Sequence, residues 1–201
     1  MSVTVSTIAS TVARAHQAMG PLEQVLNDAD AKLGDGDTGG MLARVIGKMA
    51  EVDLSGAADP GAALTQLAKA ATVATGSSLG TLFATGLLAA GREAKGRPAI
   101  AAGDLAGLVA TARDAMIARG GASLGDKTVL DSLDAIAAAL QGAKTIEGAA
   151  EAAAKSAAEA LDAFRSKPNR IGRARMFGDQ TIGHDDPGML AIKALSAALA
   201  A

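Results

Sequence analysis

Three aspartates, Asp30, Asp35 and Asp37, share one short stretch of the chain with four glycines between positions 34 and 40. Carboxylates this close in sequence repel one another unless a cation lies between them. Mg²⁺ prefers such oxygen ligands and fills the rest of its coordination shell with waters and phosphate oxygens. The glycines permit unusual backbone angles and let a ligand approach the main chain. The stretch therefore predicts a site for Mg²⁺ and phosphate.

Two other interpretations of this stretch fit its residues less well. A calcium-binding EF-hand loop starting at Asp28 fails, because its fifth position is Lys32 and its twelfth, which requires a bidentate Glu, is Gly39. Helix capping by aspartate explains one of the three carboxylates, but it explains three carboxylates among four glycines poorly. The metal site is the favoured interpretation.

Three further clusters combine glycines with polar residues. The segment 75–80, with Ser77 and Ser78, opens a helix whose free N–H groups could bind phosphate, although a plain serine N-cap explains it equally well. It is not a Walker A loop, since no Gly-Lys-Ser/Thr follows. Arg173 lies in a short basic island that would neutralise anionic oxygens beside a phosphate site. Asp186 followed by Pro187 has the pattern of an N-cap and a first helical turn.

Lys127 and Thr128, at the start of another helix, are either surface residues or contacts to a nucleotide, and we favour the second interpretation. Histidine is a common general base, but a loop histidine such as His184 more often serves as a hydrogen-bonding residue. We assign it no catalytic role, and the sequence predicts no catalytic residue on this chain.

Composition limits the classes of function. The chain has 201 residues, enough for one domain spanning 1–201, and it contains 49% hydrophobic but only 1% aromatic residues. Few aromatics and a net charge of −2 argue against nucleic-acid and membrane-surface binding. The absence of cysteine excludes disulfides and thiolate chemistry. The N-terminus lacks the pattern of a secretory signal, so we expect a soluble cytoplasmic protein.

Helical spacing of apolar residues extends along nearly the whole chain and predicts an all-α fold. It is clearest from Thr145 to Phe164, where alanines recur at three- and four-residue steps and charged residues occupy the other face. Gly20-Pro21 is expected to separate the first two helices. The other predicted helices are Val5–Met19, Leu22–Lys32, Met41–Val52, Ala62–Ala74, Gly80–Lys95, Leu105–Arg119, Lys127–Leu140 and Met189–Ala200.

The four glycine-containing clusters all lie at predicted helix ends. In an up-and-down bundle, alternate connections gather at the same end. We expect the first cluster (30–40), the second (74–80) and the fourth (172–188) to form one site.

These motifs, in this order, resemble the nucleotide-binding L subunit of dihydroxyacetone kinase, or the equivalent C-terminal domain of single-chain ATP-dependent dihydroxyacetone kinases. The resemblance covers nearly the whole chain. The segments that carry it are Gly34-Asp35-Gly36-Asp37-Thr38-Gly39, Gly80-Thr81-Leu82-Phe83-Ala84-Thr85, Arg119-Gly120 with Gly125-Asp126-Lys127-Thr128-Val129-Leu130-Asp131, Gly172-Arg173-Ala174, and Ile182-Gly183-His184-Asp185-Asp186-Pro187-Gly188.

The resemblance implies an antiparallel barrel of about eight amphipathic helices with the nucleotide site at one end. It implies that Asp30, Asp35 and Asp37 hold a pair of Mg²⁺ ions against the phosphates of ADP or ATP. Leu79 replaces a serine common in the family, so only its backbone N–H would serve there. Together the motifs and the resemblance predict these nucleotide-binding residues: Thr38, Gly39, Gly40, Met41, Ser77, Ser78, Leu79, Gly120, Lys127, Thr128, Val129, Arg173, Asp186, Pro187 and Gly188.

The activity implied by the resemblance is phosphoryl transfer to a short-chain ketose, such as dihydroxyacetone or erythrulose, held on a partner K subunit. Thr38 stands where many phosphoenolpyruvate-dependent L subunits have histidine, which favours a nucleotide that exchanges. Three alternatives stay open: ADP that is retained and rephosphorylated by a phosphocarrier M subunit, a regulatory module that binds a transcription regulator, and a different acceptor. A homodimer is also possible.

Overall fold

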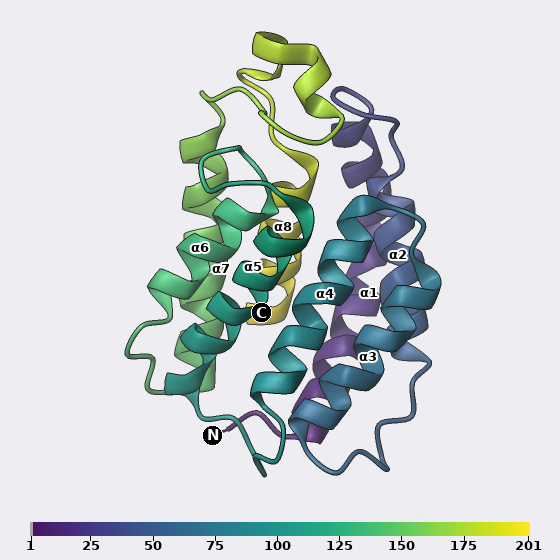
Figure 1. Cartoon of the computed structure of the whole chain (residues 1–201), viewed down its shortest axis with the longest axis vertical. Coiled ribbons are helices and arrows are strands. Elements are labelled where there is room, and N and C mark those ends of the chain that lie inside the picture. The colour runs from purple at the N-terminus through teal and green to yellow at the C-terminus, as the bar shows by residue number, and fades with distance from the viewer. Residues whose placement is uncertain (1) are drawn as a thin grey trace.

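The computed structural model describes residues 2–201, and these form eight α-helices and two short 3₁₀ segments (Figure 1). The α-helices are α1 (Val5–Asp30), α2 (Thr38–Ala50), α3 (Pro60–Ala74), α4 (Ser78–Glu93), α5 (Leu105–Gly120), α6 (Val129–Ala139), α7 (Ile146–Phe164) and α8 (Pro187–Ala200). The 3₁₀ segments are η1 (Ala102–Asp104) and η2 (Ala174–Thr181). The all-α prediction is confirmed.

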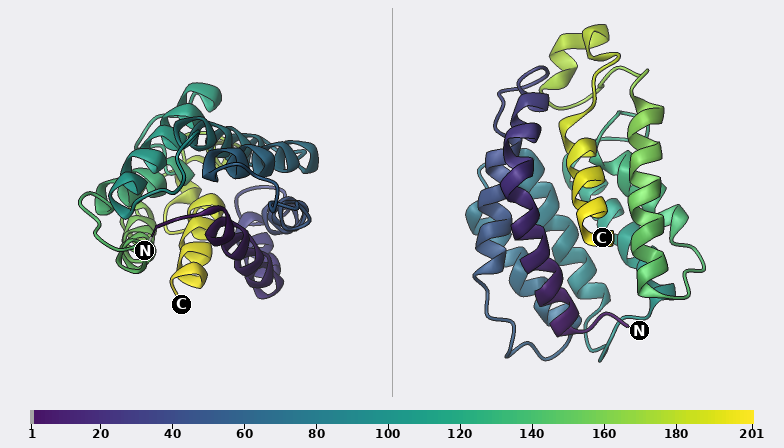
Figure 2. Two further views of the ribbon diagram at one scale, coloured as in Figure 1. Left: turned by 90° about the horizontal axis from the view of Figure 1, so that it is seen from below. Right: turned by 180° about the vertical axis from the view of Figure 1, so that it is seen from behind.

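The helices run alternately up and down and close into a ring. Each helix contacts the next along the chain, and α8 returns to contact α1. The views from below and from behind show α8 lying between α1 and α7 (Figure 2). An even number of helices in a closed antiparallel ring places the α1–α2, α3–α4, α5–α6 and α7–α8 connections at the same end.

Side chains at the helix starts fix where most helices begin. Thr4, Asp59, Ser77, Thr145 and Asp186 each accept a hydrogen bond from a backbone N–H in the first turn of the helix that follows. Such a cap satisfies one of the amides that a helix leaves without an internal partner. The helices therefore start within a few residues of the predicted positions.

Aliphatic and methionine side chains form the core. Its largest buried cluster joins α1, α2 and α3 through residues such as Met19, Leu26, Val45 and Leu67. Because aromatic side chains are scarce, the helices fill the core by packing closely at alanine and glycine positions. Gly61 shows this best, because a Cβ there would lie 2.5 Å from the carbonyl oxygen of Gly91 on the neighbouring helix.

The predicted break at Gly20-Pro21 is wrong, because α1 continues through Pro21 to Asp30 as one helix. Proline removes one backbone hydrogen bond from a helix interior and is normally destabilising there. Here Met19 and Leu26 lie on either side of it in the same buried cluster. Burial of a continuous apolar face thus overrides the local preference.

Two smaller features complete the fold. Val3 and Ile100 exchange backbone hydrogen bonds of 2.8 and 2.9 Å, which ties the N-terminal residues to the α4–α5 connection. Among residues 2–201, no helix has both the length and the apolar character that crossing a bilayer requires.

Candidate functional site

A pocket of about 800 Å³ lies at the end of the barrel where the four connections meet. Residues from all four connections line it, including Arg119, Gly120 and Ala122 from the end of α5. The expectation that the first, second and fourth clusters gather at one end omitted the third cluster, which also lines the pocket. Two antiparallel helices separate each cluster from the next, so the third cluster lies at the same end of the barrel as the other three.

The three predicted metal ligands converge on one side of this pocket. Asp30, Asp35 and Asp37 each offer a carboxylate oxygen, and these oxygens all lie within 4.8 Å of one another. Asp30 is buried, whereas Asp35 and Asp37 are exposed to the pocket. A set of hard oxygen donors at this spacing suits Mg²⁺, which binds through one or two carboxylates and completes its shell with water and phosphate.

Asp30 is fixed by the backbone that follows it. Its Oδ2 accepts hydrogen bonds from the N–H groups of Asp37 at 2.9 Å and Thr38 at 3.1 Å. The turn between them approaches so closely that a Cβ at Gly34 would lie 2.3 Å from Oδ1 of Asp30. Glycine at this position is therefore required if the carboxylate is to keep this orientation.

Asn27 holds the beginning of α2, and sequence reasoning missed it. Its Oδ1 accepts hydrogen bonds from the N–H groups of Gly39 at 2.8 Å and Gly40 at 3.1 Å. Neither glycine lines the pocket. The predicted N–H donors of these two residues are thus already engaged by α1, and an asparagine one helical turn before Asp30 is the signal that could have revealed it.

The start of α4 presents donors to the pocket. Ser77 accepts a hydrogen bond from the N–H of Gly80 at 3.0 Å, which leaves the first two N–H groups of the helix, those of Ser78 and Leu79, at the pocket lining. These amides have no acceptor within the helix itself. A helix start of this kind attracts anions through its amides and its dipole.

Asp186 lines the pocket at the start of α8. Its Oδ1 accepts from the N–H of Met189 at 2.9 Å, and its Oδ2 accepts from Nδ2 of Asn169 at 2.8 Å. Burial raises the pKa of this carboxyl to about 6, and these hydrogen bonds offset only part of the increase. Pro187 and Gly188 follow it along the lining.

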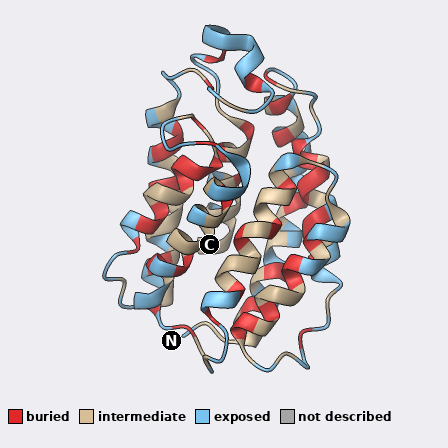
Figure 3. Cartoon of the chain, in the orientation of Figure 1, coloured by how far each residue is buried: buried red, intermediate tan, exposed pale blue. Residues whose placement is uncertain are grey.

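Residues 165–186, here called the α7–α8 connection, include η2 and line the pocket with residues 171–174. Figure 3 shows η2 at the top of the molecule with most of its surface exposed. From this connection Arg173 forms an ion pair with Asp35. A cationic side chain thus lies beside the predicted metal ligands, within reach of anionic oxygens bound there.

An apolar surface lies among these polar groups, and sequence reasoning missed it. Leu82, Ala122, Leu130 and Ile171 line the pocket between the start of α4 and the α7–α8 connection. Most of the same side chains form a core cluster with Met116 and Val129. The pocket therefore offers both charged ligands and an apolar surface, which is the combination typical of small-molecule sites.

The prediction for Lys127 is wrong. Its side chain is only 1% exposed and does not line the pocket. Its ammonium group instead donates to the backbone carbonyls of Lys167 at 2.8 Å and Thr181 at 2.9 Å. Lys127 has a φ of 62° and precedes helix α6, which begins only at Val129, so it does not occupy the helical position that the sequence predicted.

The structure brings most of the predicted residues to one place. Gly39, Gly40 and Lys127 are outside the pocket lining, and His184 lies by a smaller cavity beside α1. The predicted residues that line the large pocket are Asp30, Asp35, Asp37, Thr38, Met41, Ser77, Ser78, Leu79, Gly120, Thr128, Val129, Arg173, Asp186, Pro187 and Gly188.

Comparison with known families agrees with this arrangement. The family model described as the DAK2 domain matches residues 32–201, which is most of the chain. The chain belongs to the DAK2 domain family. This DAK2 domain is 27% identical to the ADP-binding subunit DhaL of the PEP-dependent dihydroxyacetone kinase of Escherichia coli, over 96% of this chain and 94% of that subunit.

Longer proteins also contain a similar domain. The DAK2 domain is 36% identical to part of a D-erythrulose kinase of Mycolicibacterium smegmatis, covering 90% of this chain but only 33% of that kinase. The fold matches the dihydroxyacetone kinase of C. freundii in complex with AMP-PNP and Mg²⁺, with a TM-score of 0.75 and 24% identity, over 97% of this chain and 33% of that one. The DAK2 domain thus spans about a third of these larger relatives.

Proposed function

We propose that this chain binds a magnesium–adenine nucleotide complex in the pocket and supplies the phosphoryl donor of a ketose kinase. The single observation that carries the proposal is the convergence of Asp30, Asp35 and Asp37 within 4.8 Å beside the start of α4. Relatives named as an ADP-binding subunit and as an erythrulose kinase support the nucleotide and the class of acceptor.

Each part of the pocket has a task in this proposal. The three aspartates would hold a pair of Mg²⁺ ions, as the family resemblance implies, and the metal would neutralise phosphate charge. The N–H groups of Ser78 and Leu79 would donate to phosphate oxygens. Arg173 would exchange its bond with Asp35 for the incoming phosphates. The apolar surface at Leu82 would pack against the base.

The acceptor does not need a site on this chain. Phosphoryl transfer relies on positioning and charge neutralisation, and both are available here for the donor. Within the pocket lining, no histidine stands ready to accept the proton of a hydroxyl group. We therefore assign the ketose and its acid–base groups to a partner K subunit, and we expect the isolated chain to bind nucleotide without phosphorylating a sugar.

Calorimetric titration with ADP, with and without Mg²⁺, tests the proposal. Binding should require Mg²⁺, and Asp35→Asn should weaken it by about 100-fold or more, since even indirect contacts to metal ligands are typically worth tenfold or more. The circular dichroism spectrum should stay helical, because the exposed Arg173–Asp35 pair contributes little stability.

Asp28→Asn is the matched control, because Asp28 is an exposed carboxylate two residues before Asp30 and does not line the pocket. It should bind ADP like the wild type. Equal weakening by both variants would contradict a specific metal site, and so would tight ADP binding without any divalent cation.

A second candidate is a relay subunit that retains ADP and has it rephosphorylated in place. The relative of similar length favours it, because that protein is named as a PEP-dependent, ADP-binding subunit. Thr38 at the start of α2 favours the exchanging form instead. Many turnovers of ketose phosphorylation with ATP and a cognate K subunit would support exchange. A single turnover, restored by a phosphorylated carrier protein, would support the relay.

A further inference from the structure

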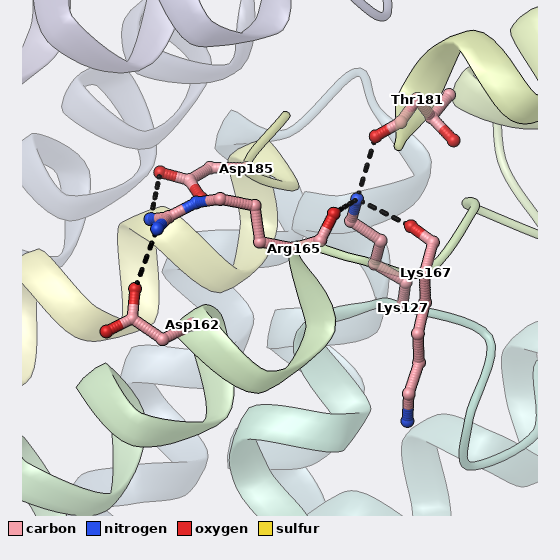
Figure 4. Close-up of polar contacts among 6 residues, drawn as sticks. All are labelled: Lys127, Asp162, Arg165, Lys167, Thr181 and Asp185. Atoms are coloured by element: carbon pink, nitrogen blue, oxygen red, sulfur yellow. Dashed lines mark hydrogen bonds and ion pairs between the residues drawn. The ribbon is translucent and has the colours of Figure 1, made fainter. Parts of the chain in front are cut away.

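Lys127 is the buried charged group that the proposed function leaves without a task. Its Nζ donates to the carbonyl oxygens of Lys167 at 2.8 Å and Thr181 at 2.9 Å, with that of Arg165 at 3.5 Å (Figure 4). An ammonium group has three donors, so three backbone carbonyls match its capacity. Among the ion pairs of residues 2–201, none includes Lys127. Burial accordingly lowers its pKa.

All hydrogen-bond partners of this buried cation are neutral carbonyls, and the charges of Asp186 and Asp185 offset only part of the cost of its burial, which makes its placement informative. The backbone is unusual as well, since Lys127 is the only non-glycine residue of 2–201 with a positive φ. Such strain persists only where the surroundings enforce it, and it concentrates near functional sites. The buried charge and the strained backbone thus occur at the same residue of the α5–α6 connection.

The carbonyls that Lys127 holds bracket the α7–α8 connection. Arg165 and Lys167 lie at its beginning and Thr181 lies near its end. One ammonium group therefore links the two ends of the connection. Arg173, which lines the pocket, lies between these two ends of the connection. Met176, close to it in η2, is 77% exposed, so burial of apolar side chains does little to hold this part.

A second set of hydrogen bonds joins the same lysine to the pocket. Its backbone oxygen accepts from Nδ2 of Asn169 at 2.9 Å, and the same amide group donates to Oδ2 of Asp186 at 2.8 Å. The N–H of Asn169 donates to Oγ1 of Thr181 at 2.8 Å. The position of the pocket residue Asp186 is thus linked to Lys127 through one buried asparagine.

We propose that Lys127 is a positioning residue: its ammonium group holds the α7–α8 connection closed so that Arg173 and Asp186 face the nucleotide. It contacts no ligand itself. The effect on nucleotide affinity rests on the proposed function, whereas the effect on the connection does not. Replacing the ammonium group should loosen residues 165–186 while the helical barrel stays intact.

Hydrogen exchange of the ligand-free chain tests the structural half. In Lys127→Met, the amides of Asn169 and Gly183, which donate to Thr181 Oγ1 and to the Arg165 carbonyl, should exchange at least about tenfold faster. Amides of α1 and α3 should be unchanged. Lys155→Met is the matched control, because the Lys155 side chain is 78% exposed on α7. Equal acceleration throughout the barrel would overturn the proposal.

Calorimetry with ADP and Mg²⁺ tests the functional half. If the closed arrangement falls to about one-tenth of the molecules, the apparent Kd of Lys127→Met rises about tenfold. Unchanged affinity in a variant whose connection exchanges faster would overturn the role in positioning. Failure of the wild type to bind the nucleotide would refute the proposed function, and the exchange experiment would still decide whether Lys127 holds the connection.

Chemical rescue distinguishes the charge from the volume of the side chain. The chain has no cysteine, so Lys127→Cys carries a single thiol that can be alkylated in the unfolded state before refolding. With 2-bromoethylamine, the thiolate displaces bromide and gives a side chain as long as lysine with an ammonium group. This product should recover slow exchange and nucleotide affinity. The neutral product of iodoacetamide should not, and recovery by both would refute a role for the charge.

Discussion

Two connections that line the pocket are held in different ways. The α1–α2 connection is fixed by close helix packing and by side chains of α1, because Asn27 and Asp30 accept the N–H groups that begin α2. The α7–α8 connection rests on Lys127 and a few polar contacts over an exposed segment.

This difference gives the metal ligands fixed positions and leaves the α7–α8 connection free to move. Metal ligands need fixed positions, and the α1–α2 connection supplies them. A segment with few buried apolar contacts opens at a lower free energy than the helices around it. We therefore expect the α7–α8 connection to open without disturbing the aspartates, which would let a nucleotide enter and leave over a preformed metal site.

The largest effect is expected from Gly39→Ala at the start of α2. A Cβ at Gly39 would lie 1.9 Å from the carbonyl oxygen of Glu23 and 2.8 Å from Oδ1 of Asn27. Backbone of α1 cannot move aside without separating the two helices. We expect a loss of about 4 kcal/mol in the free energy of unfolding, at the upper end of single substitutions, measured by urea denaturation.

Gly40→Ala is the control for that substitution, since the nearest atom to its Cβ would be the flexible Oε1 of Glu23 at 3.6 Å. It should change the stability by less than about 1 kcal/mol. Similar losses in both variants would show that the start of α2 is sensitive to any side chain, rather than to contact with α1.

The second effect concerns the cost of burying the Asp186 carboxylate at the start of α8. The pKa of Asp186 is about 6 in the folded protein against an ordinary value of 3.8, mainly because of burial. Between these values the unfolded state loses its proton while the folded state keeps it. The wild type should therefore lose up to about 3 kcal/mol relative to Asp186→Asn as the pH rises from about 3.5 to 7, measured by urea denaturation.

Asp53→Asn provides a control of opposite sign. A hydrogen bond from the N–H of Ser55 lowers the pKa of Asp53, so the folded state releases its proton first. The wild type should gain stability relative to Asp53→Asn as the pH rises toward the ordinary value of 3.8, and the difference should stay constant at higher pH. A curve for Asp186→Asn that follows the one for Asp53→Asn would contradict the burial of the Asp186 charge.

Sequence patterns predicted the all-α fold and the grouping of the three aspartates, but they missed Asn27. Apolar periodicity identified the helices because each buries one face. The grouping of Asp30, Asp35 and Asp37 followed from local spacing, and the meeting of distant connections followed from the alternation of an up-and-down bundle. These features depend on neighbours in sequence or on the order of elements, which a single sequence contains.

The remaining features depend on contacts between distant residues. Pro21 has the local signal of a helix end, but the buried face on both of its sides keeps α1 continuous. Lys127 has the charge expected of a phosphate ligand, and only the fold shows three carbonyls around it. Leu82 and Ile171 resemble ordinary core residues until their place in the pocket is known.

The smallest effect tests whether stability depends on the glycines of α5 only at the end of the helix that lines the pocket. In α5, a Cβ at Gly120 would lie 3.0 Å from Cδ2 of Leu82, whereas Gly107, in the first turn at the other end, has no atom within 4 Å of its added Cβ. Gly107→Ala should raise the free energy of unfolding by about 0.5–1 kcal/mol, because alanine loses less backbone entropy in a helix. Gly120→Ala must instead displace Leu82 from the apolar lining. Urea denaturation of both variants measures the difference. Equal stabilisation would show that the pocket end of α5 can accommodate a Cβ at Gly120 without displacing Leu82.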